Sequence, residues 1–375
     1  MPRRWASRLL LLSGLFVIAL AVSPKSLAQQ PGSVDKVTFR DRTQDGKIVT
    51  DTFEIKESSK GVEIIVGGKT KSMISPADIV KIDYGSPAGI NKADQLKAMA
   101  MEDTKNAVES LREYSDLVKK ATAANAPEKT RRFLLIREAQ WMTKIADTKM
   151  GEDFKTEASK ALEKWLTVKG MSKKSWEIWP VARTAARLQI ELGKYTEAAA
   201  TLQELGNVAD LPKELQFEAK LAEAAATLRA DRKQGLTVEG ALDAIEKDKD
   251  LPTGPLQDRL KVLKAVIKVP ATSGDTAEQK EAAGVAITKL RDVIEAAKDP
   301  VAKAVGYNFL GDSHMAYNQF RDAQWAYLWV DTVFNQDVDE RVIACRKLID
   351  IFDLGSDEAS KERAIQFKER LPKVR

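Results

Sequence analysis

The sequence holds a single cysteine and a single histidine, and this scarcity limits the chemistry open to the chain. Cys345 has no second cysteine for an internal disulfide, and its apolar neighbours indicate a buried position on a helix. His314 has no second histidine and no nearby cysteine to complete a zinc or haem site. We therefore expect no metal or other cofactor, and a stability that comes from packing alone.

Long apolar runs are equally scarce, because only residues 9–22 form one. Three arginines precede this run, and the small residues Ser26 and Ala28 follow it, which is the pattern of a secretory signal peptide. The run is shorter than the roughly 20 residues that span a bilayer. We therefore expect a signal peptide over residues 1–28, cleaved near Ala28, rather than a retained anchor. The mature chain is then exported, periplasmic or associated with the cell envelope, and has no transmembrane segment.

The chain beyond Ala28 also lacks an excess of one charge sign. Residues 1–28 hold four of the 60 basic residues and none of the 55 acidic ones, which leaves a net charge of about +1 for the remainder. Residues 34–85 contain nine bases and nine acids. We therefore expect no nucleic-acid partner, because overall charge supplies most of the attraction to phosphate backbones.

Short segments rich in β-branched residues occupy residues 34–85, after an expected linker at 29–33. Turn formers such as Asp45-Gly46 and Gly67-Gly68 separate them, which predicts five antiparallel strands. Residues 75–78 resemble the single 3₁₀ turn before the last strand of SH3-like and Sm-like small barrels. This resemblance implies a small five-stranded antiparallel β-barrel. We expect its strands at residues 37–39, 48–55, 62–66, 69–74 and 79–84.

From residue 92 to the end the pattern is helical, and no strand is expected there. Apolar residues at three-to-four spacing from Leu96 to Val118 predict one long amphipathic helix. Glycine and proline separators then delimit the rest, so we expect an α+β multidomain chain with an all-α domain at 92–375. Its further helices are expected at about residues 128–148, 152–168, 176–192, 196–206, 212–232, 237–248, 255–268, 276–298, 300–317, 320–335, 338–353 and 357–370.

Two of the turns between these helices share a pattern. Each has a small residue, an aromatic two positions later, an acidic residue at four and alanine at five, which marks the tight turn of a helical hairpin. The residues are Gly193, Tyr195, Glu197 and Ala198 at one turn and Asn318, Phe320, Asp322 and Ala323 at the other.

The second turn lies in a segment that resembles a tetratricopeptide repeat, with Gly311 and Ala323 small where two helices cross and Tyr327 filling the space between them. The clearest repeats span residues 304–337 and 179–212, and the latter departs from the family at Ala185 and Leu202. The resemblance implies a solenoid of helical hairpins. Because the two turns are not separated by a multiple of 34 residues, the solenoid is expected to be degenerate. An unrelated α/α array, or a catalytic α/α domain, is the alternative.

The repeat register supplies the first candidate site residues. Arg183 and Arg187 lie one turn apart on a first helix, toward the concave side, and Asn308 and Asp312 occupy the equivalent positions in the last repeat. The chaperone-tail clamp of the family needs Lys and Asn at these places, so that activity is not implied. The arginines could hold a carboxylate or an acidic peptide. Alternatively, they form ion pairs with residues such as Glu191 on a solvated surface.

Tryptophans supply the other candidates. Trp176 and Trp179 bracket the entry to the weaker repeat, and Trp325 and Trp329 lie four residues apart in the last one. They either pack between hairpins or form an aromatic anchor for a peptide or glycan. With no catalytic set in the sequence, we expect a non-enzymatic exported scaffold that binds protein or peptide partners. The alternative is an envelope protein that binds glycan, peptidoglycan or a small molecule.

Overall fold

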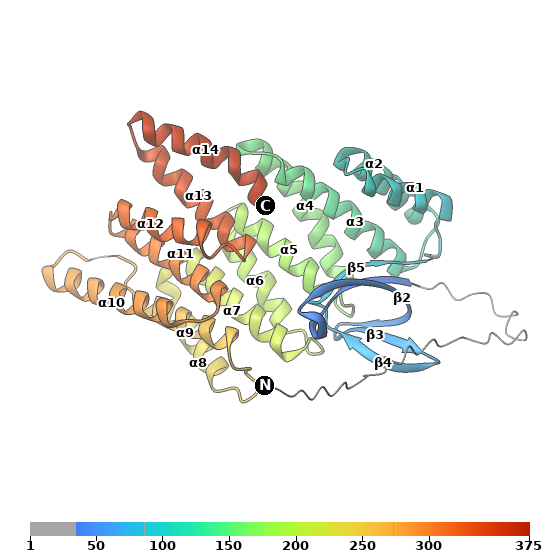
Figure 1. Cartoon of the computed structure of the whole chain (residues 1–375), viewed down its shortest axis with the longest axis horizontal. Helices are drawn as coiled ribbons and strands as arrows, with labels where there is room; N and C mark the ends of the chain where they lie inside the picture. Colours follow the sequence, from blue (N-terminus) through green and yellow to red (C-terminus); the bar gives the residue numbers. More distant parts are fainter. Residues whose placement is uncertain (1–34, 86, 273) are drawn as a thin grey trace, which may run out of the picture.

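The computed structural model describes residues 35–85, 87–272 and 274–375. The expected signal peptide at 1–28 and linker at 29–33 lie outside the described residues. An antiparallel sheet at the N-terminal side is followed by fourteen α-helices in this part of the chain (Figure 1). The expectation of an α+β chain is confirmed.

The sheet contains the five strands that the sequence predicts, all antiparallel and in the order β4-β3-β2-β1-β5. Residues 47–53 of β2 pair with β1 and residues 54–58 pair with β3, so β2 joins two half-sheets. Among the described pairs, β4 and β5 are not hydrogen-bonded to each other, and the sheet is not closed. The strands are β1 (Asp35–Asp41), β2 (Lys47–Ser58), β3 (Gly61–Val66), β4 (Lys69–Ile74) and β5 (Ile79–Asp83).

The turns of the sheet are those that the sequence specifies. Gly67 and Gly68 both have positive φ, 59° and 75°, as the tight turn between β3 and β4 requires. Gly61 has φ 135°, and a Cβ built there would lie 2.0 Å from the carbonyl oxygen of Ile74. The buried side of the sheet is apolar and packs against helices, through Val37, Val62, Ile64, Ile74, Ile79 and Ile82.

The helices follow each other with short connections. Prolines and aspartates begin several of them, as at Asp299-Pro300, where the Asp299 carboxylate accepts from the backbone N–H groups of Val301 and Ala302. Their bounds are α1 (Lys92–Asp103), α2 (Ala107–Ala123), α3 (Glu128–Asp147), α4 (Gly151–Met171), α5 (Ile178–Glu191), α6 (Tyr195–Gly206), α7 (Lys213–Ala230), α8 (Gly235–Glu246), α9 (Pro255–Lys268), α10 (Ala277–Ala296), α11 (Pro300–Ala316), α12 (Phe320–Thr332), α13 (Val338–Leu354) and α14 (Glu358–Val374).

The prediction of one long helix from Leu96 to Val118 is wrong. The chain breaks between α1 and α2, where Lys105 has φ 56° and the Asn106 side chain caps α2 by accepting from the Glu109 N–H. The Tyr114 hydroxyl of α2 donates to the Glu102 carboxylate of α1 at 2.6 Å. Of the apolar residues that suggested one helix, Leu96 and Ala100 of α1 are exposed whereas Tyr114 of α2 is buried, so the two segments do not share one apolar face.

The array of helices curls back on itself. Consecutive helices pack side by side, α9 packs on α7 and α11, and α13 reaches α5, which lies more than a hundred residues earlier. The last residue confirms this return, because the Arg375 guanidinium donates to the Glu191 carboxylate at 2.8 Å and to the Lys149 carbonyl at 3.0 Å. Figure 1 shows α13 and α14 beside α4 and α5. The end of the chain is therefore held against the middle of the helical array.

Among the described residues, no helix has the length and apolar character required to span a bilayer.

Candidate functional site: a charged cavity inside the helical array

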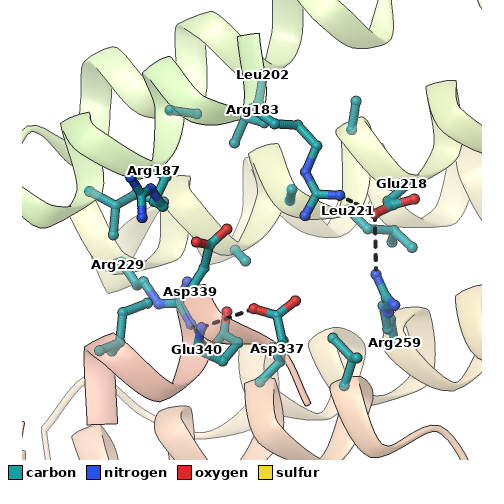
Figure 2. A pocket seen from close by; sticks show the side chains of 18 of the residues that line it. Arg183, Arg187, Leu202, Glu218, Leu221, Arg229, Arg259, Asp337, Asp339 and Glu340 are labelled. Atoms are coloured by element: carbon teal, nitrogen blue, oxygen red, sulfur yellow. Dashed lines mark hydrogen bonds and ion pairs between the residues drawn. The ribbon is translucent and has the colours of Figure 1, made fainter. Parts of the chain in front are cut away.

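A cavity of about 100 Å³ lies where α5, α7, α9 and the start of α13 meet (Figure 2). One side is apolar, with Leu202 and Leu221 on the wall. The other side is charged, with side chains from four helices and from the residue before one of them. Its charged residues are Arg183 and Arg187 from α5, Glu218 and Arg229 from α7, Arg259 from α9, and Asp337, Asp339 and Glu340 from the start of α13.

A chain of ion pairs crosses the first half of the cavity. The Arg183 guanidinium donates to the Glu218 carboxylate at 3.1 Å, and Arg259 approaches the same carboxylate at 3.9 Å. Arg259 also pairs with Asp299 at 3.0 Å. The Arg183 guanidinium lies 5.3 Å from the ring centroid of Trp179, which adds a cation–π contact. This chain ties α5, α7, α9 and the start of α11 together.

Arg187 pairs with a different set of carboxylates. Its guanidinium lies 3.5 Å from the Asp147 carboxylate at the end of α3 and 3.9 Å from Glu191, one turn later on α5. Glu191 also receives Arg346 and Arg375 from α13 and α14. The pairing with Glu191 is one of the two alternatives that the sequence leaves open for this arginine.

A second network joins α7, α11 and α13. The Arg229 side chain is only 6% exposed, and its guanidinium donates to the Glu340 carboxylate at 2.6 Å. The Asn308 amide donates to the same carboxylate oxygen at 2.7 Å and to the Glu340 carbonyl at 2.9 Å. Removal of either Arg229 or Glu340 would leave the other charge buried without its partner, which is costly.

Asp339 differs from the other carboxylates of the cavity. Figure 2 shows it directed from α13 toward the space beside Arg187 and Arg229. Burial above all raises its pKa to about 7, the neighbouring Asp337 acts in the same direction, and Arg183 and Arg187 oppose the shift. Asp339 can therefore gain or lose a proton near neutral pH, while the surrounding arginines stay charged.

The structure brings together only some of the residues expected from the sequence. Arg183, Arg187 and Trp179 line this cavity, and Asn308 reaches its edge through Glu340. Asp312 does not, because its carboxylate accepts from the Tyr327 hydroxyl at 2.7 Å and pairs with Lys347 at 3.3 Å. Trp176 lines a different cavity, beside the sheet.

Sequence reasoning missed Glu218, Arg229, Arg259 and Asp339. Each is one of several charged residues on its helix, and no local signal distinguishes the charges that face the cavity from those that face solvent. Only the curl of the array brings them together.

No family model matches the chain, and no curated protein or solved structure shows a significant similarity to it. Within residues 35–85, 87–272 and 274–375, no three histidine, cysteine, aspartate or glutamate side chains are grouped so as to hold a metal ion.

Proposed function

We propose that the protein is a non-enzymatic, exported scaffold that binds protein or peptide partners through the surface of its helical array. The observation that carries this proposal is an exposed aromatic surface on α12. Trp325 is 59% exposed and Trp329 45%, and the two lie one turn apart on the same side of α12. Large aromatic side chains in this position are costly to leave in water and are typical anchors of protein interfaces.

The charged cavity supports this choice of surface. Its arginines already have carboxylate partners within the chain, and about 100 Å³ is too small for an extended peptide. A partner therefore binds outside the array, and the interior ion pairs serve to hold the helices in place. The arginine pair Arg183 and Arg187 then positions α5 rather than capturing a ligand.

The finer architecture belongs to the same proposal. We propose that the sheet is a small barrel of the SH3-like or Sm-like kind, supported by β2, whose two halves pair with different strands. We propose that the helices form a degenerate tetratricopeptide-like solenoid. The support is the crossing of α11 and α12, where a Cβ on Gly311 would lie 2.6 Å from the Tyr327 ring and Ala323 is fully buried.

The test is capture of partners from an envelope extract, with the chain from residue 29 onward as bait, a cross-linker and mass spectrometry. Trp325→Ala should remove at least one protein that the unaltered bait enriches. Leu354→Ala is the matched control, because Leu354 is an exposed apolar side chain on another helix. If the unaltered bait enriches no protein in mild salt, the proposal falls.

A second candidate function rests on the cavity of about 550 Å³ between β5, α3 and α5. Trp141, Trp165 and Trp176 line it, and the buried Trp176 Nε1–H has no hydrogen-bond partner among the described residues. Aromatic walls with an unpaired donor suit a glycan or another small polar ligand. Titration with muropeptides should then quench tryptophan fluorescence, and Trp176→Phe should reduce the quenching. Flat titrations would remove this candidate.

A further inference from the structure

We propose that the groove between α10 and α12 binds an acidic peptide segment of a protein partner, anchored by an apolar or aromatic side chain. The inference rests on the proposed scaffold function and names the class of its partner. The groove has a volume of about 450 Å³. In Figure 1, α11 lies between α10 and α12 at the rim of the array.

Each helix contributes one face to the groove. The α10 wall consists of Lys280, Gly284, Ile287 and Arg291, which repeat at three-to-four spacing and so lie on one side of that helix. Leu310 and His314 of α11 form the floor, and Asp322 of α12 stands on the opposite wall. A Cβ built on Gly284 would meet nothing within 4 Å, so this wall is open to an incoming side chain.

Aromatic side chains lie beside one end of the groove, next to the residues that line it. Tyr307 is on the floor helix, one turn before Leu310, and its ring stacks on Trp329 with centroids 6.2 Å apart and on Phe334 at 5.5 Å. Trp329 lies two turns after Asp322 on the same flank of α12, and Trp325 lies at the rim. This end provides an exposed aromatic platform on which an apolar anchor can pack.

The charge of the groove determines which peptide fits. Lys280 and Arg291 are exposed, and neither pairs with a carboxylate in the described part of the chain. Lys303 adds positive charge beside the platform, 5.5 Å from the centroid of the Phe334 ring. Among the described residues that line the groove, Asp322 is the only acid. The acidic side chains of a bound peptide are therefore favoured along the α10 wall. Asp322 disfavours their placement along the α12 wall.

Exposed tryptophans beside lysines also occur in proteins that bind anionic membranes. Membrane binding requires apolar side chains on a surface that can meet a flat bilayer. Here the charged residues line a hollow between helices, and Trp329 packs sideways on Tyr307. The geometry therefore favours a peptide over a lipid surface.

The experiment uses the chain from residue 29 onward and three fluorescein-labelled 12-residue peptides, read by fluorescence anisotropy. The first peptide contains Glu, Leu and Phe, the second has every Glu replaced by Lys, and the third has Leu and Phe replaced by Ser. We expect the first to bind at least tenfold more tightly than the other two. We expect Lys280→Glu with Arg291→Glu to invert the preference between the first two, and Trp325→Ala to weaken the first at least threefold.

Lys289→Glu is the matched control, because Lys289 is an exposed lysine on the opposite side of α10, and it should leave the preference unchanged. Circular dichroism of each variant excludes unfolding as the cause. Equal affinities for the three peptides, no measurable binding, or a preference that survives the double charge reversal would overturn the proposal. The proposal would also be overturned if the protein sedimented with phosphatidylglycerol vesicles and bound none of the peptides. If the double variant still captures from the envelope extract the partners that the unaltered protein captures, the scaffold function stands and the groove assignment alone falls.

Discussion

The charged cavity inside the array and the groove between α10 and α12 are both lined by one face of each of several helices, yet they differ in how their charges are paired. In the cavity, Arg183, Arg229 and Arg259 each have a carboxylate within 3.1 Å. In the groove, Lys280 and Arg291 have none among the described residues. Arg229 of the cavity is buried, whereas Lys280 and Arg291 of the groove are exposed.

The difference separates two uses of a charged residue. A buried charge must be paired within the chain, since leaving it unpaired in the interior is costly, and it then helps to fix the arrangement of helices. An exposed charge needs no such partner, so it remains available to a ligand. An arginine on a concave helix face could belong to either group, and its position in the sequence does not say which.

The largest effect on the comparison is expected when a buried arginine of the cavity loses its carboxylate partner. Glu340→Ala leaves the buried Arg229 guanidinium without its carboxylate, and we expect a loss of about 3–5 kcal/mol in unfolding free energy. Urea denaturation measures it. Arg229→Met combined with Glu340→Leu should cost much less, because no charge is then left behind. If the single variant is as stable as the original, the pair does not hold the array together.

The frame of the groove is tested by two glycines with opposite surroundings. Gly311→Ala places a Cβ 2.6 Å from the buried Tyr327 ring, so we expect a loss of about 1–3 kcal/mol. Gly284→Ala, in the open wall of α10, should instead stabilise the helix by about 0.5–1 kcal/mol. Thermal melts of both variants provide the measurement. Equal effects of the two would mean that α11 and α12 do not cross as described.

Asp339 makes the interior sensitive to pH. Its folded pKa of about 7 lies above the ordinary value of 3.8, so the folded state holds the proton more tightly. Its contribution to stability is therefore present at low pH and is lost as the pH rises from about 4 to 7. Asp339→Asn should match the original protein at pH 4 and exceed it at pH 8 by on the order of 1 kcal/mol.

Urea denaturation at both pH values checks this expectation. Glu177, whose pKa burial also raises to about 7, is present in both proteins and cancels in the difference. A variant that is less stable at pH 8 would show that Arg183 and Arg187 stabilise the ionised Asp339 more than burial disfavours it.

The smallest effect is expected at the rim of the groove. Trp325 is 59% exposed and stacks on no other ring within the described residues, so Trp325→Ala should change the unfolding free energy by less than about 0.5 kcal/mol. Trp329→Ala removes two ring contacts and should cost about 1 kcal/mol or more. Denaturation curves compare the two. A large loss in the first variant would place Trp325 in the core rather than in a binding surface.

Much of the secondary structure could be predicted because its signals are local. Glycine pairs mark the hairpin turn at 67–68, and aspartates such as Asp299, Asp337 and Asp357 cap the helices that follow them. The break between α1 and α2 could not be predicted, because apolar spacing carries on across Lys105. The candidate site was only partly predictable, since Arg183 and Arg187 follow from the hairpin register but their partners do not.

The sequence by itself determined the approximate positions of the five strands and of most helices, and that one cysteine cannot form a disulfide within the chain. It also marked Gly311 and Ala323 as places where helices cross closely. Only the tertiary structure decided that Arg229 meets Glu340, 111 positions later, and that Arg375 returns to Glu191. The physical reason is range: turns and caps act over a few residues, whereas the curl of the array sums small rotations over many hairpins.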